Sequence, residues 1–262
     1  MRGGCKDKKG SLGRLLLKSG VWAASSVLAV LLVWQIAALV TGNEYLLPSP
    51  WETLKQTGRL LVSGTFWLAL FSTLLRSLIA FSVAFVLGVF FAVIAYLSPS
   101  FRSFLSGMVG VTRAVPTVAV ILLLLVWTGP KTAPLWVAGL TLFPLIYTSV
   151  LTALGRVDEK LLGMSAVYRV PLRKKITGLY IPAALPSVLK EGSAAASFSI
   201  KLVVSAEVLA NTFKSVGGLM QESKIYLETP TLLALTVCVA VIGVIVEKLG
   251  FFFGERLEAK WR

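Results

Sequence analysis

The chain has 262 residues, of which 56% are hydrophobic, and its mean hydropathy is +0.82. These values exclude a soluble domain, since several runs approach the roughly 20 apolar residues that cross a hydrocarbon core. Isolated strands would leave backbone groups without partners in lipid, so the sequence predicts helical spans. We assign the net charge of +14 to cytoplasmic loops rather than to nucleic-acid binding.

Several kinds of chemistry are missing from the sequence. Histidine is absent, which removes the commonest general base and metal ligand. Cys5 stands in a basic tail and Cys238 in an apolar block, so we interpret both as free thiols. Neither a phosphate-binding loop, a zinc-type cluster nor a nucleophile elbow occurs. Any nucleotide-driven work therefore falls to a partner chain.

The first 65 residues predict a tail, a span and an outer loop. Residues 1–20 are basic, and residues 21–41 form an apolar run. This order is typical of a signal peptide, but the run is long and no convincing small-residue cleavage site follows. We therefore expect an uncleaved anchor with its N-terminus inside. Residues 42–65 form the outer loop, with an amphipathic stretch that Ser49 caps and Pro50 begins.

Residues 66–262 are expected to form the core, which holds spans two to six and a cytoplasmic loop at 155–192. Arg76, at the outer end of the second span, is interpreted as a snorkelling arginine. A short connection, Ser98–Thr112, leads to the third span, which Pro116 interrupts. The expected spans are Ser77–Leu97, Ala114–Thr128, Ala133–Leu154, Ser193–Phe213 and Thr231–Phe253.

Two charged residues, Lys201 and Glu207, fall within the fifth predicted span. A charge inside a span is costly and usually faces protein or water. The two residues lie about 240° apart around a helix, so they are not neighbours on one face. A pathway role for Lys201 and two structural interpretations all stay open: Lys201 paired inside the bundle, and Glu207 near the outer surface.

The distribution of basic residues predicts the topology. The inner segments of a six-span arrangement hold eighteen lysines and arginines, and the outer segments hold five. This bias places both termini in the cytoplasm, together with the segment between spans four and five.

That segment, 155–192, predicts a structured platform. Asp158 is expected to cap a helix that begins at Glu159, and Pro171 is expected to end it. Leu161, Ser165 and Tyr168 share one face of this helix at helical spacing. A second apolar stripe consists of Leu172, Ile176 and Leu179, and Pro182 and Pro186 are expected to break the chain before the fifth span.

Several motifs resemble those of the inner-membrane permeases of binding-protein-dependent ABC importers, in the nitrate, sulfonate and taurine branch. Their order and spacing, from Leu46 to the C-terminus, carry the resemblance. Counting back from IPAALPS places Gly163, Met164 and Ser165 at the family's EAA positions and Arg169 at its glycine, so this half of the motif is degenerate. The motifs are LLPSP, STLLRSLIAFSVAFVLG, TRAVPTVAVILLLLVWTG, IPAALPS and SAEVLANTFKSVGGLMQES.

The resemblance implies an all-α, polytopic permease of the type I importer kind in the inner membrane. It would move a small solute, such as a nitrate-, sulfonate- or taurine-like anion or a vitamin precursor, by alternating access. The implied partners are cytoplasmic ATPase subunits that carry ATP and Mg, a periplasmic or surface-anchored binding protein, a second permease copy and membrane lipid. No cofactor on this chain and no nucleic acid are expected.

The resemblance also assigns two groups of site residues. Those that couple to the ATPase are Gly163, Met164, Ser165, Ala166, Tyr168, Arg169 and Pro182, and those of the translocation pathway are Arg113, Pro116, Thr117, Ser199, Lys201 and Glu207. Because the motif is degenerate, weak or lost coupling stays open.

Three other functions stay open at this point. The first is a stand-alone secondary transporter or channel that uses Lys201 and Glu207, although no convincing inverted repeat occurs. The second is an intramembrane enzyme, which the missing histidine and the lack of paired carboxylates disfavour. The third is a membrane anchor for a signalling ATPase, which does not transport.

Overall fold

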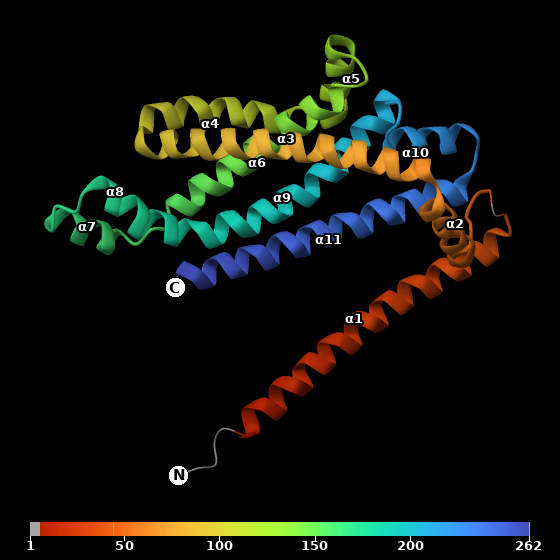
Figure 1. Cartoon of the computed structure of the whole chain (residues 1–262), viewed down its shortest axis with the longest axis horizontal. Coiled ribbons are helices and arrows are strands. Elements are labelled where there is room, and N and C mark those ends of the chain that lie inside the picture. The colour runs from red at the N-terminus through yellow and green to blue at the C-terminus, as the bar shows by residue number, and fades with distance from the viewer. Residues whose placement is uncertain (1–5, 44, 262) are drawn as a thin grey trace.

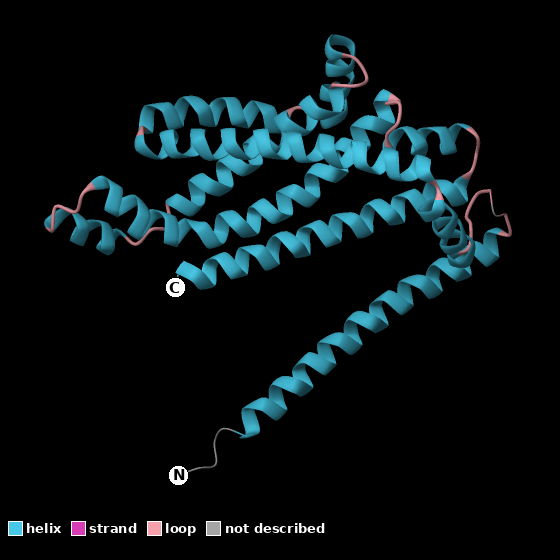
Figure 2. Cartoon of the chain, viewed as in Figure 1, coloured by secondary structure: helices cyan, strands magenta, loops and turns pink. Residues whose placement is uncertain are grey.

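A computed structural model describes residues 6–43 and 45–261, and these residues form helices without strands (Figures 1 and 2). Cys5, Glu44 and Arg262 lie outside the described residues. The helices are α1 (Lys6–Thr41), α2 (Pro50–Val62), α3 (Gly64–Leu97), α4 (Pro99–Ala114), α5 (Thr117–Thr128), α6 (Ala133–Leu154), α7 (Glu159–Val167), α8 (Leu172–Lys175), a π-helix η1 (Ile176–Tyr180), α9 (Ile181–Ala210), α10 (Val216–Ile225) and α11 (Thr229–Trp261).

Four helical stretches are long and apolar enough to cross a membrane: α3, α6, Arg173–Ala210 and Thr229–Arg256. The pair α4 and α5 passes the same test together but is bent by 94°. The apolar part of α1, Ser25–Thr41, is shorter. The described residues therefore hold four spans, or five if the bent pair is one, and the count of six stays a prediction.

The helices extend beyond the predicted spans. α3 begins at Gly64, well before Ser77, and α1 already begins at Lys6, within the expected tail. The expected short connection before the third span is wrong, because α4 occupies it. The expected break at Pro182 and Pro186 is also wrong. Pro182 stands in the first turn of α9, directly after the π-helix η1, and the interior Pro186 removes only one backbone hydrogen bond. The helical stretch Arg173–Ala210 therefore runs through both prolines.

The break at Pro116 has a local cause. The ring of a proline disfavours the helical conformation of the preceding residue, and Val115 is accordingly extended at φ −76° and ψ 128°. α4 ends there, and α5 begins at Thr117 in a new direction. The predicted interruption at Pro116 is therefore confirmed.

The centre of the bundle is the contact of α3 with α6, and α9 packs between α6 and α11 (Figure 1). One face of α3 carries small residues, which let neighbouring helices approach closely. At Gly88 the approach is closest, since an added Cβ would lie 2.8 Å from Cγ2 of Ile146 on α6. The small buried residues of α3 are Ala69, Thr73, Ser77, Ala80, Ala84, Gly88, Ala92 and Ala95.

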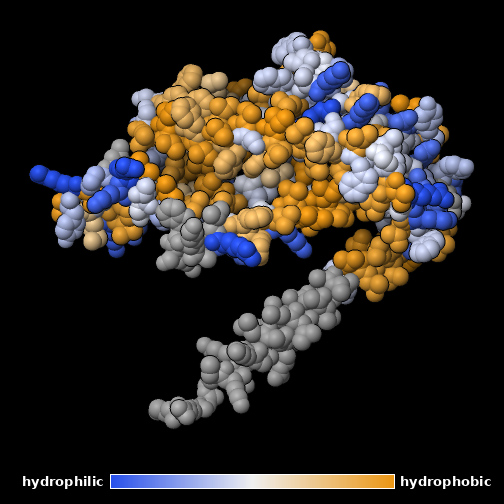
Figure 3. All heavy atoms as spheres, in the orientation of Figure 1, coloured by the Kyte–Doolittle hydropathy of each residue, from blue (hydrophilic) through white to orange (hydrophobic). Residues whose placement is uncertain are grey.

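The two ends of the bundle differ from its middle. Hydrophobic side chains cover the middle, and hydrophilic side chains gather toward the ends (Figure 3). α7 and α8 lie at one end, which we call the platform end, and α11 ends on the same side (Figure 1). α2 and α10 lie at the opposite end. This separation is the pattern of a bundle whose apolar belt faces lipid.

Replacing Gly88 by alanine is expected to lower the free energy of unfolding by about 1–3 kcal/mol, because the added methyl group would push α3 away from α6. The midpoint of thermal unfolding should fall accordingly. Gly107 on α4 is a matched control, since nothing lies within 4 Å of a Cβ added there. Gly107→Ala should stabilise the helix by about 0.5–1 kcal/mol. Thermal unfolding of both variants in one detergent measures the difference, and equal midpoints would contradict the close packing.

Candidate functional site

The platform helix α7 begins where the sequence predicts, at Glu159. The backbone N–H of Lys160 donates to Oδ1 of Asp158 at 2.8 Å, which confirms the predicted cap. Ser165 is buried, and its hydroxyl donates to the carbonyl of Leu162 at 2.7 Å. The predicted shared face is therefore split, because Tyr168 lies beyond the last helical residue and points outward.

Three apolar side chains on α7 and its C-terminal cap are strongly exposed. Met164 is 57% exposed, Val167 79% and Tyr168 75%. We call these three residues the platform patch. Gly163 and Ala166 are exposed beside them, whereas Pro182 is half-buried at the start of α9. Contiguous apolar side chains on a polar end of a protein commonly mark a surface that contacts another protein.

Arg169 stands at the motif's glycine position and adopts a glycine-like conformation, with φ at +47°. The N–H of Val170 donates to the carbonyl of Ser165, and the N–H of Arg169 donates to that of Ala166, both at 3.0 Å. These two bonds form a Schellman motif, whose left-handed residue is usually glycine. Arg169 thus takes the left-handed conformation that glycine usually takes in such a turn, at a cost in backbone strain.

At the opposite end, Glu207 on α9 is fully buried in a network of hydrogen bonds. Nη1 of Arg76 lies 2.7 Å from Oε1, and the hydroxyl of Thr73 donates to Oε2 at 2.8 Å. The N–H of Gly217 on α10 donates to Oε2 at 3.3 Å. The N–H of Val216 in turn donates to the hydroxyl of Thr73 at 3.0 Å. The network ties α3, α9 and α10 together.

This network corrects one interpretation. Arg76 does not snorkel to the surface, since its side chain is only 19% exposed and pairs with Glu207. Glu207 itself is enclosed within the protein, with an exposure of 0%. A complete set of donors is what allows a carboxylate to be buried in this way. Opposite charges in two separate apolar runs were a signal for this pair, but nothing in the sequence pointed to Thr73 or Gly217.

The other predicted pathway residues lie in different surroundings. Ser199 is buried, and its hydroxyl donates to the carbonyl of Ser77 on α3 at 2.9 Å. Nη2 of Arg113 donates to the hydroxyl of Thr148 at 2.6 Å and to the carbonyl of Pro144 at 3.3 Å. Pro116 and Thr117 form the start of α5 at the bend. The structure therefore does not gather the predicted pathway residues into one pocket.

Lys201 belongs to an exposed stripe along α9. Within the part of the chain that the structure describes, it forms no ion pair. A Cβ added at Gly243 of α11 would lie 3.9 Å from Cε of Lys201, which places the lysine stem beside α11. A charge in this position needs water or protein around it. The exposed residues of the stripe are Glu191, Ala194, Phe198, Lys201, Ser205 and Leu209.

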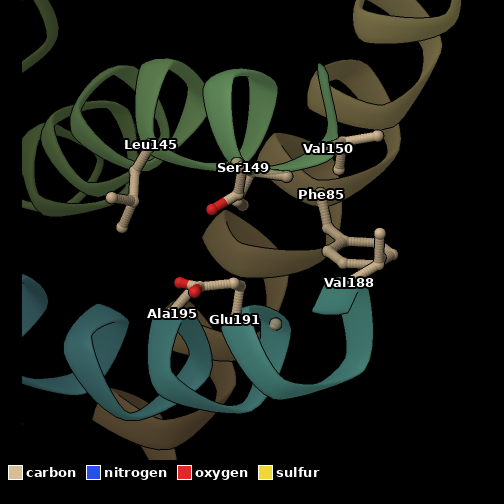
Figure 4. Close-up of a pocket in the computed structure, with 9 residues that line it drawn as sticks. Phe85, Leu145, Ser149, Val150, Val188, Glu191 and Ala195 are labelled. Atoms are coloured by element: carbon tan, nitrogen blue, oxygen red, sulfur yellow. The ribbon is translucent and has the colours of Figure 1, made fainter. Parts of the chain in front are cut away.

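Between α6 and α9 the side chains of Ser149 and Glu191 point toward one another across a narrow gap (Figure 4). Phe85, Val150 and Val188 enclose the gap on its apolar side. A second hollow of about 190 Å³ adjoins it, and its polar lining includes Thr152 and Arg156, as well as Thr148 and Ser187. The platform-side half of α6 thus presents hydroxyl groups rather than a continuous apolar face.

These features define a class of protein: a polytopic helical bundle with an exposed platform at one end and polar surfaces between its helices. Residues 84–260 match the family described as "Binding-protein-dependent transport system inner membrane component". The chain belongs to this family. It is therefore a multi-pass inner-membrane protein and a permease subunit of an ABC importer of the taurine and sulfonate branch.

Curated relatives agree over most of their length. The taurine transport system permease protein TauC of Escherichia coli K12 is 26% identical over 255 residues, which cover 94% of this chain and 91% of that protein. The putative aliphatic sulfonates transport permease protein SsuC of Bacillus subtilis 168 is 24% identical over 235 residues, or 89% and 84% of the two chains.

Solved structures support the fold. A bacterial ABC transporter involved in the import of alginate aligns at a TM-score of 0.62 and 14% identity, covering 97% of this chain and 96% of that one. An amino acid ABC transporter aligns at 0.63 and 17% identity, covering 73% and 94%. The predicted all-α permease fold is therefore confirmed.

Glu207→Gln is expected to destabilise the protein by roughly 3–5 kcal/mol, because it leaves the guanidinium of Arg76 enclosed without its counter-charge. The pair Glu52–Lys55, at 3.6 Å, offers a control at the protein surface, since its side chains are 26% and 54% exposed. Glu52→Gln should cost less than about 1 kcal/mol. Thermal unfolding measures both, and a loss at Glu207 no larger than that at Glu52 would contradict the network's structural role.

Arg169→Gly is expected to stabilise the turn after α7 by about 1 kcal/mol, because glycine adopts a positive φ without strain. Hydrogen–deuterium exchange of the amides in residues 159–170 should slow accordingly. Arg173→Gly serves as the control, since Arg173 lies in the helix α8. Glycine weakens a helix, so the amides of α8 should exchange faster in this variant. Faster exchange in Arg169→Gly would show that the arginine side chain, rather than the turn, matters.

Proposed function

We propose that the chain is the membrane-spanning half of an importer in which a separate ATPase, carrying ATP and Mg, drives a solute across the membrane by alternating access. The observation that carries this proposal is the platform patch, an exposed apolar surface on a capped helix at one polar end of the bundle. The patch falls within the segment 163–169, which the resemblance aligns with the coupling motif of the family. The kept turn at Arg169 supports coupling despite the degenerate motif.

In this proposal the platform end is cytoplasmic, and both termini lie on that side. The division of the chain follows: a basic tail at 1–20, the first span at 21–41, an outer loop at 42–65, and a permease core at 66–262 with its coupling loop at 155–192. Coupling would use Gly163, Met164, Ser165, Ala166, Tyr168, Arg169 and Pro182. The opposite end, with α2 and α10, would receive a periplasmic or surface-anchored binding protein.

A second copy of the chain would complete the pathway. The exposed stripe of α9 supports this, since Lys201 in a lipid-facing position would be costly and a pore between two copies would hydrate it. Arg113, Pro116 and Thr117 would border the same pathway from α4 and α5. Ser199 and Glu207 would act indirectly, by holding α9 against α3.

The solute would be a small anion of the nitrate, sulfonate or taurine kind, or a vitamin precursor. The names of the relatives support this class, as do the cationic side chains of Arg113 and Lys201. A stand-alone transporter that uses Lys201 and Glu207 is less well supported, because the carboxylate of Glu207 already accepts three hydrogen bonds and is closed to solvent.

Tyr168→Asp is expected to reduce retention of the ATPase by the detergent-solubilised chain about thirtyfold, because a central aromatic contact is replaced by a charge. Val62→Asp makes the same kind of change at the opposite end, on a residue that is 88% exposed. Affinity capture with quantification of the ATPase measures the effect, alongside the amount of chain in the membrane. Equal retention by both variants, with normal solute uptake, would contradict the proposed coupling surface.

A further inference from the structure

A groove between α4 and α6 gathers polar side chains on a bundle whose surface is otherwise largely apolar. Its volume is about 340 Å³. The polar residues on α4 recur at helical spacing and therefore share one face. We call it the α4–α6 groove, and its polar lining consists of Arg102, Ser106 and Arg113 on α4, and Tyr147, Thr148 and Thr152 on α6.

The hydroxyl of Tyr147 is the feature that points to a ligand. The side chain is 1% exposed, and its hydroxyl has no hydrogen-bond partner among the described residues. Buried hydroxyl groups are nearly always paired, because leaving one without a partner is costly. Since Tyr147 lines the groove, a group bound there would supply the missing partner.

The charges around this hydroxyl all have one sign. Arg113 is held in place by Thr148 and by the carbonyl of Pro144, and a guanidinium has further donors beyond these two bonds. Arg102 forms neither a hydrogen bond nor an ion pair with another described side chain. No aspartate or glutamate lines the groove. The lining is therefore complementary to an acceptor with negative charge.

We propose that the α4–α6 groove is a binding subsite for the oxyanion group of the transported solute, which rests on the proposed transport function. The guanidinium of Arg102 pairs with the oxygens in a fork, and Tyr147 donates its hydroxyl hydrogen. Arg113 places a second positive charge further along the groove. Ser106 and Thr152 add further hydroxyl donors along the groove.

The phosphate of a lipid headgroup has the same chemistry, but the length of the groove favours a solute. Arg102 lies near the start of α4, and Arg113 lies eleven residues further, about 16 Å along the helix. A hydrocarbon core is about 30 Å thick, so this distance reaches about half-way through it. Headgroup phosphates stay at the interface, whereas a solute in transit passes through this depth.

The experiment uses the full chain in nanodiscs of phosphatidylcholine, with sodium methanesulfonate as the probe and sodium chloride at equal ionic strength as the reference. Methanesulfonate is expected to raise the thermal midpoint of the unaltered chain in a saturable way. Its apparent affinity should fall about tenfold in Arg102→Gln and in Tyr147→Phe, since each variant removes a charge-assisted hydrogen bond. Arg59→Gln, which removes an exposed arginine on α2, should bind as the unaltered chain does.

Three results would overturn the subsite. In the first, methanesulfonate does not raise the thermal midpoint of the unaltered chain. In the second, Arg59→Gln loses as much apparent affinity for methanesulfonate as the groove variants do. In the third, phosphatidylglycerol nanodiscs stabilise the chain and methanesulfonate has no effect. The last result would identify a lipid site. Binding is measured without the ATPase. If methanesulfonate does not bind but uptake in cells is normal, only the subsite is rejected. Failed uptake with intact binding instead rejects the proposed transport function.

Discussion

The enclosed pair of Arg76 and Glu207 is the interaction on which the arrangement of the helices depends. A carboxylate inside a membrane protein is costly unless every oxygen finds a donor. Thr73 and Gly217 supply the donors that Arg76 does not. Because these groups come from three helices, satisfying Glu207 sets how α3 and α9 are rotated against each other and how α10 is seated across them.

The two ends of α9 have different mechanical characters. Its C-terminal end is held by the buried network, whereas its N-terminal end continues into the platform through η1 and α8. The helix has 30 residues and is about 45 Å long. It is continuous despite Pro186, so one helical element joins the platform end of the bundle to the buried network at the opposite end.

Polar groups along the helices divide into those that hold the bundle together and those that remain available. The hydroxyls of Ser199 and Thr73 donate hydrogen bonds to groups on neighbouring helices. Lys201 and Arg102 have no such partner among the described side chains, and both lie on exposed surfaces. In hydrocarbon such charges require water or another protein around them.

The sequence alone determined the class of the protein, because hydropathy, basic-residue bias and motif order are local or additive properties. It also determined the cap at Asp158, the start of α7 and the bend at Pro116, since each depends on a few adjacent residues. Tertiary structure decided the rest. Whether Arg76 meets lipid or Glu207 depends on the rotation of two helices more than 100 residues apart, and the donor from Gly217 depends on how α10 folds back. The continuation of α9 through Pro182 and Pro186 was also decided by tertiary structure, because the packing of the whole helix outweighs the local tendency of proline to end a helix.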